Sequence, residues 1–307
     1  MTLVRAAASK LSAAWMMVLA TVLFAGMGLC VKKASAEVTT AEVVFFRGLV
    51  GALIMATLAW SQRLPLRTQV PRQHLWRGVA GVSALSLWFY AMAHLPLATA
   101  VTLNYMSSVW MAVFLMLRQL WKRWRAAPHT PIPPMLLGAV LLGFVGVALV
   151  LRPTLQRDQW LQGLAALLSG MLSAWAYLQV AALGRSGEPE HRVVFYFSLF
   201  GTLVGLLLMG GRALSDTQAW VSPSLSGWAW LLSIGLFATA AQLAMTRAYA
   251  HGQPLAMASL QYLGIVHAFL LGVWFFDEPV YTLSVVGTVL IVVAGIAANR
   301  LGSAMRN

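Results

Sequence analysis

The sequence predicts an all-α integral membrane protein whose ten transmembrane helices form two inverted repeats of five helices each. Hydrophobic residues make up 60% of the 307 residues and charged residues only 9%, whereas about one quarter of the residues in soluble domains are charged. Two similar stretches, Ala91–Ala98 and Ala248–Ala256, each end one apolar segment with His and Pro and begin the next. The composition therefore indicates a membrane protein, and the repeated stretch indicates an internal duplication.

Ten apolar segments follow one another along the chain. Each approaches the roughly 20 residues that a helix needs to cross about 30 Å of hydrocarbon. Strand-like alternation is absent, so helices rather than a barrel should satisfy the backbone. The first segment is long enough to span, and we expect it to be retained rather than cleaved as a signal peptide. In order, the segments are Leu11–Val31, Val43–Trp60, Leu75–Leu95, Leu97–Leu120, Met135–Leu151, Trp160–Leu183, Val193–Gly210, Trp228–Tyr249, Leu255–Phe276 and Val280–Ala298.

The basic residues of the loops predict that both termini are cytoplasmic, because cytoplasmic loops carry an excess of Lys and Arg. With the amino terminus inside, fourteen such residues fall in inner segments and five in outer ones. The inner residues are Arg5, Lys10, Arg63, Arg67, Arg72, Arg77, Arg118, Lys122, Arg123, Arg125, Arg185, Arg192, Arg300 and Arg306, and the outer ones are Lys32, Lys33, Arg152, Arg157 and Arg212.

The two halves, residues 1–153 and 154–307, also match segment by segment. Val43–Phe46 in the second segment corresponds to Val193–Tyr196 in the seventh, and glycines recur at matched places in the fifth and tenth. Five spans is an odd number, so the second half must enter the membrane in the opposite sense. Inverted repeats of this kind build transporters around a site where the repeats meet.

Several classes of function are disfavoured by the residue pattern. The formal net charge is +13, but the basic residues are scattered between apolar segments, which argues against nucleic-acid binding. Cys30 is the single cysteine and cannot form an internal disulfide. Walker, CxxC, HExxH and nucleophile-elbow motifs are missing, so we expect no catalytic residue, metal or cofactor. All eight carboxylates lie at or beyond segment ends: Glu37, Glu42, Asp158, Glu188, Glu190, Asp216, Asp277 and Glu278.

Three motifs are familiar: Phe45-Phe46-Arg47-Gly48, Pro96-Leu97-Ala98-Thr99-Ala100 and Asp277-Glu278-Pro279. Together with the five-plus-five arrangement, they make the chain resemble the drug/metabolite transporter superfamily, specifically its bacterial ten-helix EamA-type members. The resemblance implies secondary transport by alternating access from a central cavity. It implies a protein of the bacterial inner membrane that moves a small organic metabolite, such as an amino acid, an organic anion or a drug-like solute, as a monomer or homodimer. A lipid-modifying membrane enzyme and a structural membrane subunit are the alternatives.

Arg47 is the first candidate for solute binding. It lies about one and a half turns inside the second segment, where a cation costs up to roughly 2.5–3.5 kcal/mol, and its repeat mate is Phe197. It either binds a carboxylate or phosphate in the cavity, or snorkels and pairs with Glu42 or helix-end carbonyls.

Matched polar pairs provide further candidates, namely Asn104-Tyr105 in the fourth segment and Gln261-Tyr262 in the ninth. Amides and phenols in hydrocarbon need partners, which a cavity, a solute or a neighbouring helix can supply. His267 is the only histidine deep in a segment, and it either couples a proton to transport or stays neutral and hydrogen-bonded. Side chains that could stack on or bind a solute are Trp88, Tyr90, Trp110, Trp175, Tyr177 and Gln179.

Overall fold

The computed structural model describes residues 2–95, 97–125, 132–152, 159–215, 222–277 and 279–304, and these ranges are helical with no strand. Pro96, Arg157, Asp158, Asp216, Glu278 and Arg306 lie outside them. The helices are α1 (Thr2–Ala34), α2 (Thr40–Ser61), α3 (Pro71–His94), α4 (Leu97–Tyr105), α5 (Ser107–Trp124), α6 (Pro134–Leu151), α7 (Trp160–Arg185), α8 (Glu190–Ser215), α9 (Leu225–His251), α10 (Pro254–Gln261), α11 (Leu263–Phe276) and α12 (Thr282–Ala304).

Within the described ranges, nine helical segments are long and apolar enough to cross a membrane. Helix α3 is not among these nine segments. It has 24 residues, but its first two turns carry several polar residues. The predicted all-α membrane class is therefore confirmed. Proline begins three of the helices, α3, α6 and α10. It is favourable there because the first N–H groups of a helix have no hydrogen-bond partner within the helix, so the missing N–H of proline loses no bond.

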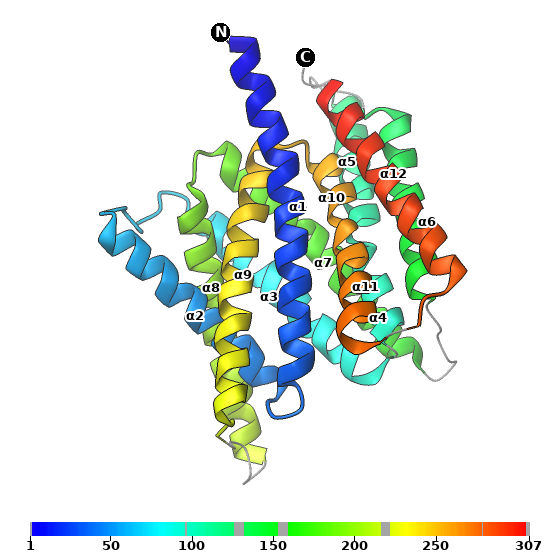
Figure 1. Cartoon of the computed structure of the whole chain (residues 1–307). Coiled ribbons are helices and arrows are strands. Elements are labelled where there is room, and N and C mark those ends of the chain that lie inside the picture. Colours follow the sequence, from blue (N-terminus) through cyan, green and yellow to red (C-terminus); the bar gives the residue numbers. More distant parts are fainter. Residues whose placement is uncertain are drawn as a thin grey trace.

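Helices far apart in the sequence pack in pairs: α1 against α9, α2 against α8, α3 against α7, and α6 against α12. Figure 1 shows α1 beside α9 at the front, with α6 and α12 on one side and α2 and α8 on the other. The start of α1 and the end of α12 lie at the same end of the molecule (Figure 1). Each of these pairs joins one half of the chain to the other.

Two of the pairs cross closely through glycines. A Cβ on Gly146 of α6 would meet the carbonyl oxygen of Gly287 at 2.7 Å, and a Cβ on Gly287 of α12 would meet that of Gly146 at 2.5 Å. Where α2 crosses α8, a Cβ on Gly205 would lie 2.5 Å from the Cα of Phe45. These backbones approach because no side chain separates them, as small residues allow between membrane helices.

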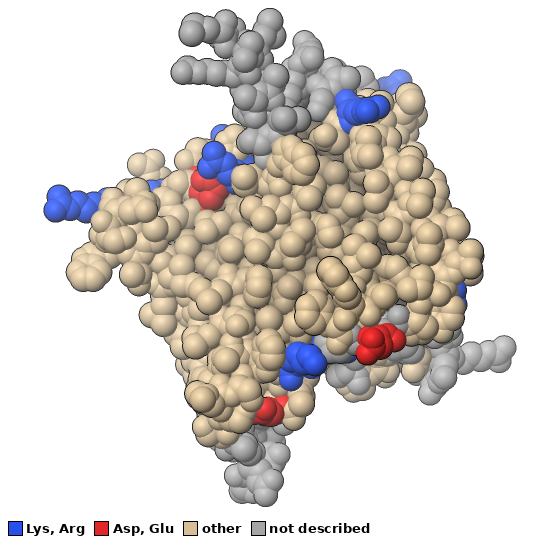
Figure 2. Space-filling model, viewed as in Figure 1, with Lys and Arg blue, Asp and Glu red and all other residues tan. Residues whose placement is uncertain are grey.

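The outer surface suits a lipid environment. On the face drawn in Figure 2, Lys, Arg, Asp and Glu lie mainly toward the two ends, with a broad uncharged band between them. Leu53, Leu206, Leu207 and Val289 are among the exposed apolar side chains. Apolar atoms facing outward over such a band are expected where lipid, not water, surrounds the protein.

The spans that the sequence predicts over 97–120 and 255–276 are found as the apolar helical segments Thr99–Trp124 and Pro254–Phe275, but each contains a short interruption. The first is interrupted at Met106 and the second at Tyr262. At each break the chain tightens into an i→i−3 turn: the Met106 N–H bonds the Leu103 carbonyl and the Tyr262 N–H bonds the Ser259 carbonyl, both at 3.3 Å. Both residues keep right-handed helical torsions, so each interruption is a local tightening of the helix.

Candidate functional site

Two pairs of repeat-matched residues touch one another where the halves of the chain meet. The guanidinium carbon of Arg47 lies 5.8 Å from the ring centroid of its mate, Phe197. The ring centroids of Tyr105 and Tyr262, the residues beside the two helix breaks, are 6.2 Å apart. We call the region around these two contacts the centre, because each contact joins one half of the chain to the other.

Arg77 is a further residue of this centre. The sequence counted it among the inner basic residues, two residues into the predicted segment Leu75–Leu95. The helix begins earlier, at Pro71, so Arg77 lies nearly two turns inside it, with 3% of its surface exposed. Its guanidinium carbon lies 4.0 Å above the Phe197 ring. Gly81, one turn further along α3, makes the room, since a Cβ there would collide with Nη1 of Arg77.

Neither arginine at the centre has a full set of partners. Nε of Arg47 and both Nε and Nη1 of Arg77 are buried without a hydrogen-bond acceptor. Among the described carboxylates, none forms an ion pair with either side chain. Sequence reasoning missed Arg77 as a site residue, although a cation within the predicted segment Leu75–Leu95 was a usable signal, because charges inside apolar segments are rare.

A hydrogen-bonded chain of side chains extends the central cluster through the second half. The Tyr249 hydroxyl donates to Oε1 of Gln261 at 3.0 Å, and Nε2 of Gln261 donates to the Tyr177 hydroxyl at 3.0 Å. The rings of Tyr177 and Tyr249 are stacked, with centroids 5.4 Å apart. Tyr177 also lies within electrostatic reach of both Arg47 and Arg77. Helices α7, α9 and α10 thus contribute to one polar cluster with α2 and α3.

The matched residues of the first half behave differently. Nδ2 of Asn104 donates to Oγ of Ser169 at 2.7 Å, which ties α4 to α7. A Cβ on Gly170 would meet the carbonyl oxygens of Leu103 and Asn104 at 2.8 and 2.9 Å. Asn104 therefore makes a helix-to-helix contact here, whereas Gln261 belongs to the tyrosine chain.

Tyr105, Tyr262 and His267 lie near the second break. The Tyr262 side chain is fully buried, and its hydroxyl has no hydrogen-bond partner. Tyr105 directs its hydroxyl to Gly264, where a Cβ would lie 2.8 Å from that oxygen. His267, in α11, is partly buried, and its Nδ1 is buried without a partner. Unpaired polar atoms of this kind occur where a ligand, water or ion is expected.

The remaining aromatic candidates do not gather at the centre. Trp110 stacks on Phe114 at 6.3 Å, and Trp175 meets Phe114 edge-on at 6.1 Å, with 45% of its surface exposed. Tyr90 is 42% exposed and lies against His94. Trp88 is partly buried in α3. Trp175 and Gln179 line an open groove of about 720 Å³ that also includes Gln69, Val70, Pro71, Arg72, Gln73 and Trp76.

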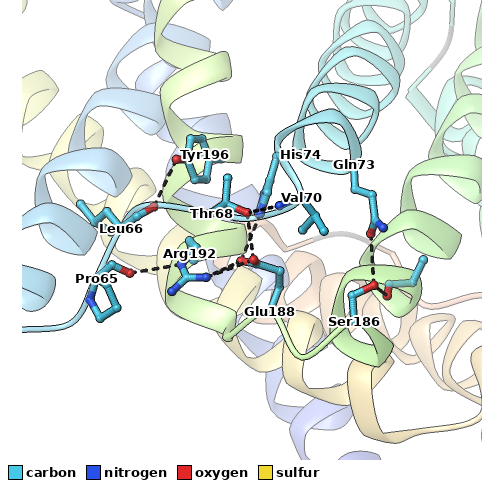
Figure 3. A network of polar contacts seen from close by, with 11 residues as sticks. Pro65, Leu66, Thr68, Val70, Gln73, His74, Ser186, Glu188, Arg192 and Tyr196 are labelled. Carbon is cyan, nitrogen blue, oxygen red and sulfur yellow. Dashed lines mark hydrogen bonds and ion pairs between the residues drawn. The ribbon is translucent and has the colours of Figure 1, made fainter.

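A second polar network surrounds Glu188, between α7 and α8 (Figure 3). Its carboxylate accepts hydrogen bonds from Thr68 at 2.8 Å and from Nη1 of Arg192 at 3.0 Å, and lies 3.3 Å from Nε2 of His74. Arg192 also donates to the Pro65 carbonyl at 3.1 Å. The network therefore fastens the α2–α3 connection to the α7–α8 connection, which lie more than a hundred residues apart.

The ionisation of Glu188 follows from this setting. Burial alone would raise the pKa of its carboxyl, but the hydrogen bonds from Thr68 and His74 and the charge of Arg192 outweigh burial and hold the pKa below its usual range. Glu37, between α1 and α2, has a comparable role at the opposite end. It accepts the Ser224 N–H at 3.0 Å, and its hydrogen bonds with Ser224 lower its pKa.

Metal-binding chemistry has little support in the described part of the chain, where no three His, Cys, Asp or Glu side chains gather closely enough to hold an ion. The polar groups at the centre are guanidinium, phenol and amide groups. Such groups suit the binding of a solute through hydrogen bonds and charge.

Comparison with known proteins agrees with this architecture. Residues 11–152 match the EamA-like transporter family. The chain is 34% identical to the pseudopaline exporter CntI of Pseudomonas aeruginosa, over 92% of this chain and 94% of that protein. It is 21% identical to the S-adenosylmethionine uptake transporter of Rickettsia prowazekii, over 82% and 80% of the two chains. A protein crystal structure with a TM-score of 0.78 and 18% identity covers 95% of this chain and 98% of its own, which shows the same fold.

Proposed function

We propose that this chain, which belongs to the EamA-like transporter family of the drug/metabolite transporter superfamily, moves a small organic metabolite across the bacterial inner membrane by alternating access. Membership of the family and the transporter names of the relatives place it among multi-pass membrane transporters. The relatives include both an exporter and an uptake transporter. The proposal therefore covers transport in either direction.

The observation that carries the proposal is the pair of helix breaks at Met106 and Tyr262. Discontinuous transmembrane helices form the solute sites of many secondary transporters, because an interrupted helix exposes polar backbone and side-chain groups at mid-membrane. Here the break at Met106 directly follows the polar pair Asn104-Tyr105, and the break at Tyr262 is the second residue of the pair Gln261-Tyr262. Both breaks adjoin the cluster that contains Tyr177, the partly buried Arg47 and the buried Arg77.

The packing pattern supports an inverted repeat of residues 1–153 and 154–307. A two-fold axis in the membrane plane would exchange the α1–α9 contact with the α3–α7 contact, and both are extensive. The same axis would map the α2–α8 and α6–α12 pairs onto themselves. It would also pass between mates that touch, as Arg47 with Phe197 and Tyr105 with Tyr262 do.

The solute site in this proposal is the central cluster of Arg47, Tyr105, Tyr177, Gln261 and Tyr262. Asn104, Trp110 and His267 lie on the helices beside it, and His267 remains the candidate for coupling a proton to transport. Tyr90, Trp175 and Gln179 belong to more exposed surfaces. Both termini would be cytoplasmic, in line with the distribution of basic residues. Because ten helices enclose the cluster within one chain, either a monomer or a homodimer is compatible with it.

The test is cysteine labelling in a Cys30→Ala background. A cysteine at Asn104 should react best from outside when the site opens outward, and one at Gln261 best from inside when it opens inward, because inverted repeats approach one site from opposite faces. A cysteine at Leu207, which is 73% exposed on the lipid-facing side of α8, is the matched control and should not react with a water-soluble reagent. If Asn104 and Gln261 positions stay unreactive in every condition, both are packing residues and the proposal is wrong.

A further inference from the structure

We infer that Arg47 and Arg77 together form a site for an oxyanion, a carboxylate or phosphate, carried by the transported solute. This inference rests on the proposed function and names the chemical class of its substrate. Its basis is that the buried guanidinium of Arg77 and the partly buried one of Arg47, on different helices, face the same ring, Phe197, at 4.0 and 5.8 Å, with no carboxylate of the described residues paired to either.

The two side chains reach the centre from opposite ends of the bundle. Arg47 is seven residues from the start of α2, or about 10 Å along its axis, and Arg77 is six residues from the start of α3, or about 9 Å. Successive helices run in opposite directions, so these depths are counted from opposite faces. Two cations that contact the same ring repel one another, and an anion between them would offset that repulsion.

Arg77 does not reach toward the nearer surface. Side chains on a helix normally point toward its amino terminus, which would let an arginine in the second turn of α3 extend to water. Instead the guanidinium lies over Gly81, one turn deeper, and over Phe197. The helix thus keeps a glycine where any side chain would displace the charged group, and it directs that group inward.

Contact with Phe197 does not replace a counter-ion. A cation–π contact stabilises a cation far less than leaving a buried charge unpaired destabilises the fold. Three buried N–H groups of these arginines also lack a hydrogen-bond acceptor: Nε of Arg47, and Nε and Nη1 of Arg77. An oxyanion would supply charge and acceptors together, and the planar fork of arginine matches the two oxygens of a carboxylate or phosphate.

Tyr177 offers an additional donor to the same ligand. Its hydroxyl oxygen accepts from Nε2 of Gln261, which leaves its own O–H free to donate. The residue lies within electrostatic reach of both arginines. We therefore include the Tyr177 phenol as a third donor of the proposed site.

The first experiment measures the thermal unfolding midpoint of the washed, ligand-free protein in detergent. Arg47→Met and Arg77→Met should each raise the midpoint, because an uncompensated buried charge is replaced by an apolar side chain of similar length. Arg247→Met is the matched control, since Arg247 is 56% exposed and lies 3.8 Å from Glu190, and it should leave the midpoint unchanged. A clear fall in the midpoint of both central variants would identify structural arginines and overturn the inference.

The second experiment measures binding of citrate and phosphate, with uncharged glycerol as the neutral probe. Wild-type protein should bind at least one anion and not glycerol, and Arg77→Lys should weaken that binding at least about tenfold because the fork is lost while the charge remains. Gly81→Ala should weaken it similarly by displacing Arg77, and Arg247→Lys should not. The preferred anion distinguishes carboxylate from phosphate. Equal binding by wild type and Arg77→Lys, or no anion binding at all, would overturn the site.

A transport assay separates this inference from the proposed function. Proteoliposomes are offered pseudopaline, S-adenosylmethionine and the anion that bound best. Anion binding without transport of any solute would keep the arginine site and reject the transporter proposal. Transport at equal rates by wild type, Arg47→Lys and Arg77→Lys would keep the transporter proposal and reject the arginine site.

Discussion

Replacing Glu188 with glutamine should destabilise the protein by about 2–3 kcal/mol. The side chain of Glu188 is 6% exposed, and it accepts bonds from Thr68 and from Arg192, with His74 3.3 Å away. Bonds to a charged group contribute roughly 1.5–3 kcal/mol each and neutral ones roughly 0.5–1.5 kcal/mol. Glutamine preserves the shape but weakens two or three such bonds, and the reduced desolvation of a neutral group offsets part of the loss.

Denaturant unfolding of the purified protein in mixed micelles measures this difference. Glu190→Gln is the matched control two residues away, because Glu190 meets only the exposed Arg247 at 3.8 Å. Exposed ion pairs contribute about 0–1 kcal/mol, so this control should change stability little. Equal losses for the two variants would refute the idea that the network in Figure 3 holds the loops together.

Glu188 should also make the stability of the folded protein depend on pH in the acidic range. The pKa of Glu188 in the folded protein is lower than its ordinary value of 4.5. Its stabilisation is therefore complete above that value and is lost as the pH falls through the lower, folded-state pKa. Wild-type unfolding midpoints should drop in this acidic range, and Glu188→Gln should drop less steeply. Parallel curves for the two proteins would contradict the assignment.

Two further predictions concern packing and topology. Gly146→Ala should destabilise the protein by roughly 1–3 kcal/mol, because the added Cβ would lie 2.7 Å from the Gly287 carbonyl oxygen. Gly138→Ala on the same helix is the control and should not destabilise it, because the space around its Cβ is open. Equal thermal midpoints for the two variants would contradict the close crossing. A reporter fused after Arg306 should be cytoplasmic and one inserted near Asp216 external, because the inner segments carry more Lys and Arg. Both positions lie outside the described residues. The reverse result would reject the predicted orientation.

Much of the candidate site could be found from the sequence, but not its composition in detail. Arg47 was identifiable because a charge inside an apolar segment is rare. Gln261 and Tyr177 were both candidates, yet nothing in their spacing, 84 residues apart, predicted the hydrogen bond between them. Arg77 was counted with the inner basic residues although it lies two residues inside the predicted segment Leu75–Leu95, and it lies deeper still because the helix starts at Pro71, about a turn earlier. Local composition does not show how a helix is rotated about its axis.

The sequence by itself determined that this is a helical membrane protein, because long apolar segments can satisfy their backbone in hydrocarbon only as helices or closed barrels. The sequence also showed the repeated motifs, the approximate positions of the spans and the family resemblance. Only the tertiary structure decided where the fourth and ninth spans break, how α3 turns Arg77 toward Phe197, and that Glu188 bonds a loop 120 residues away. Each depends on which helices pack together, and such long-range contacts are set by the shapes of both partners rather than by either segment alone.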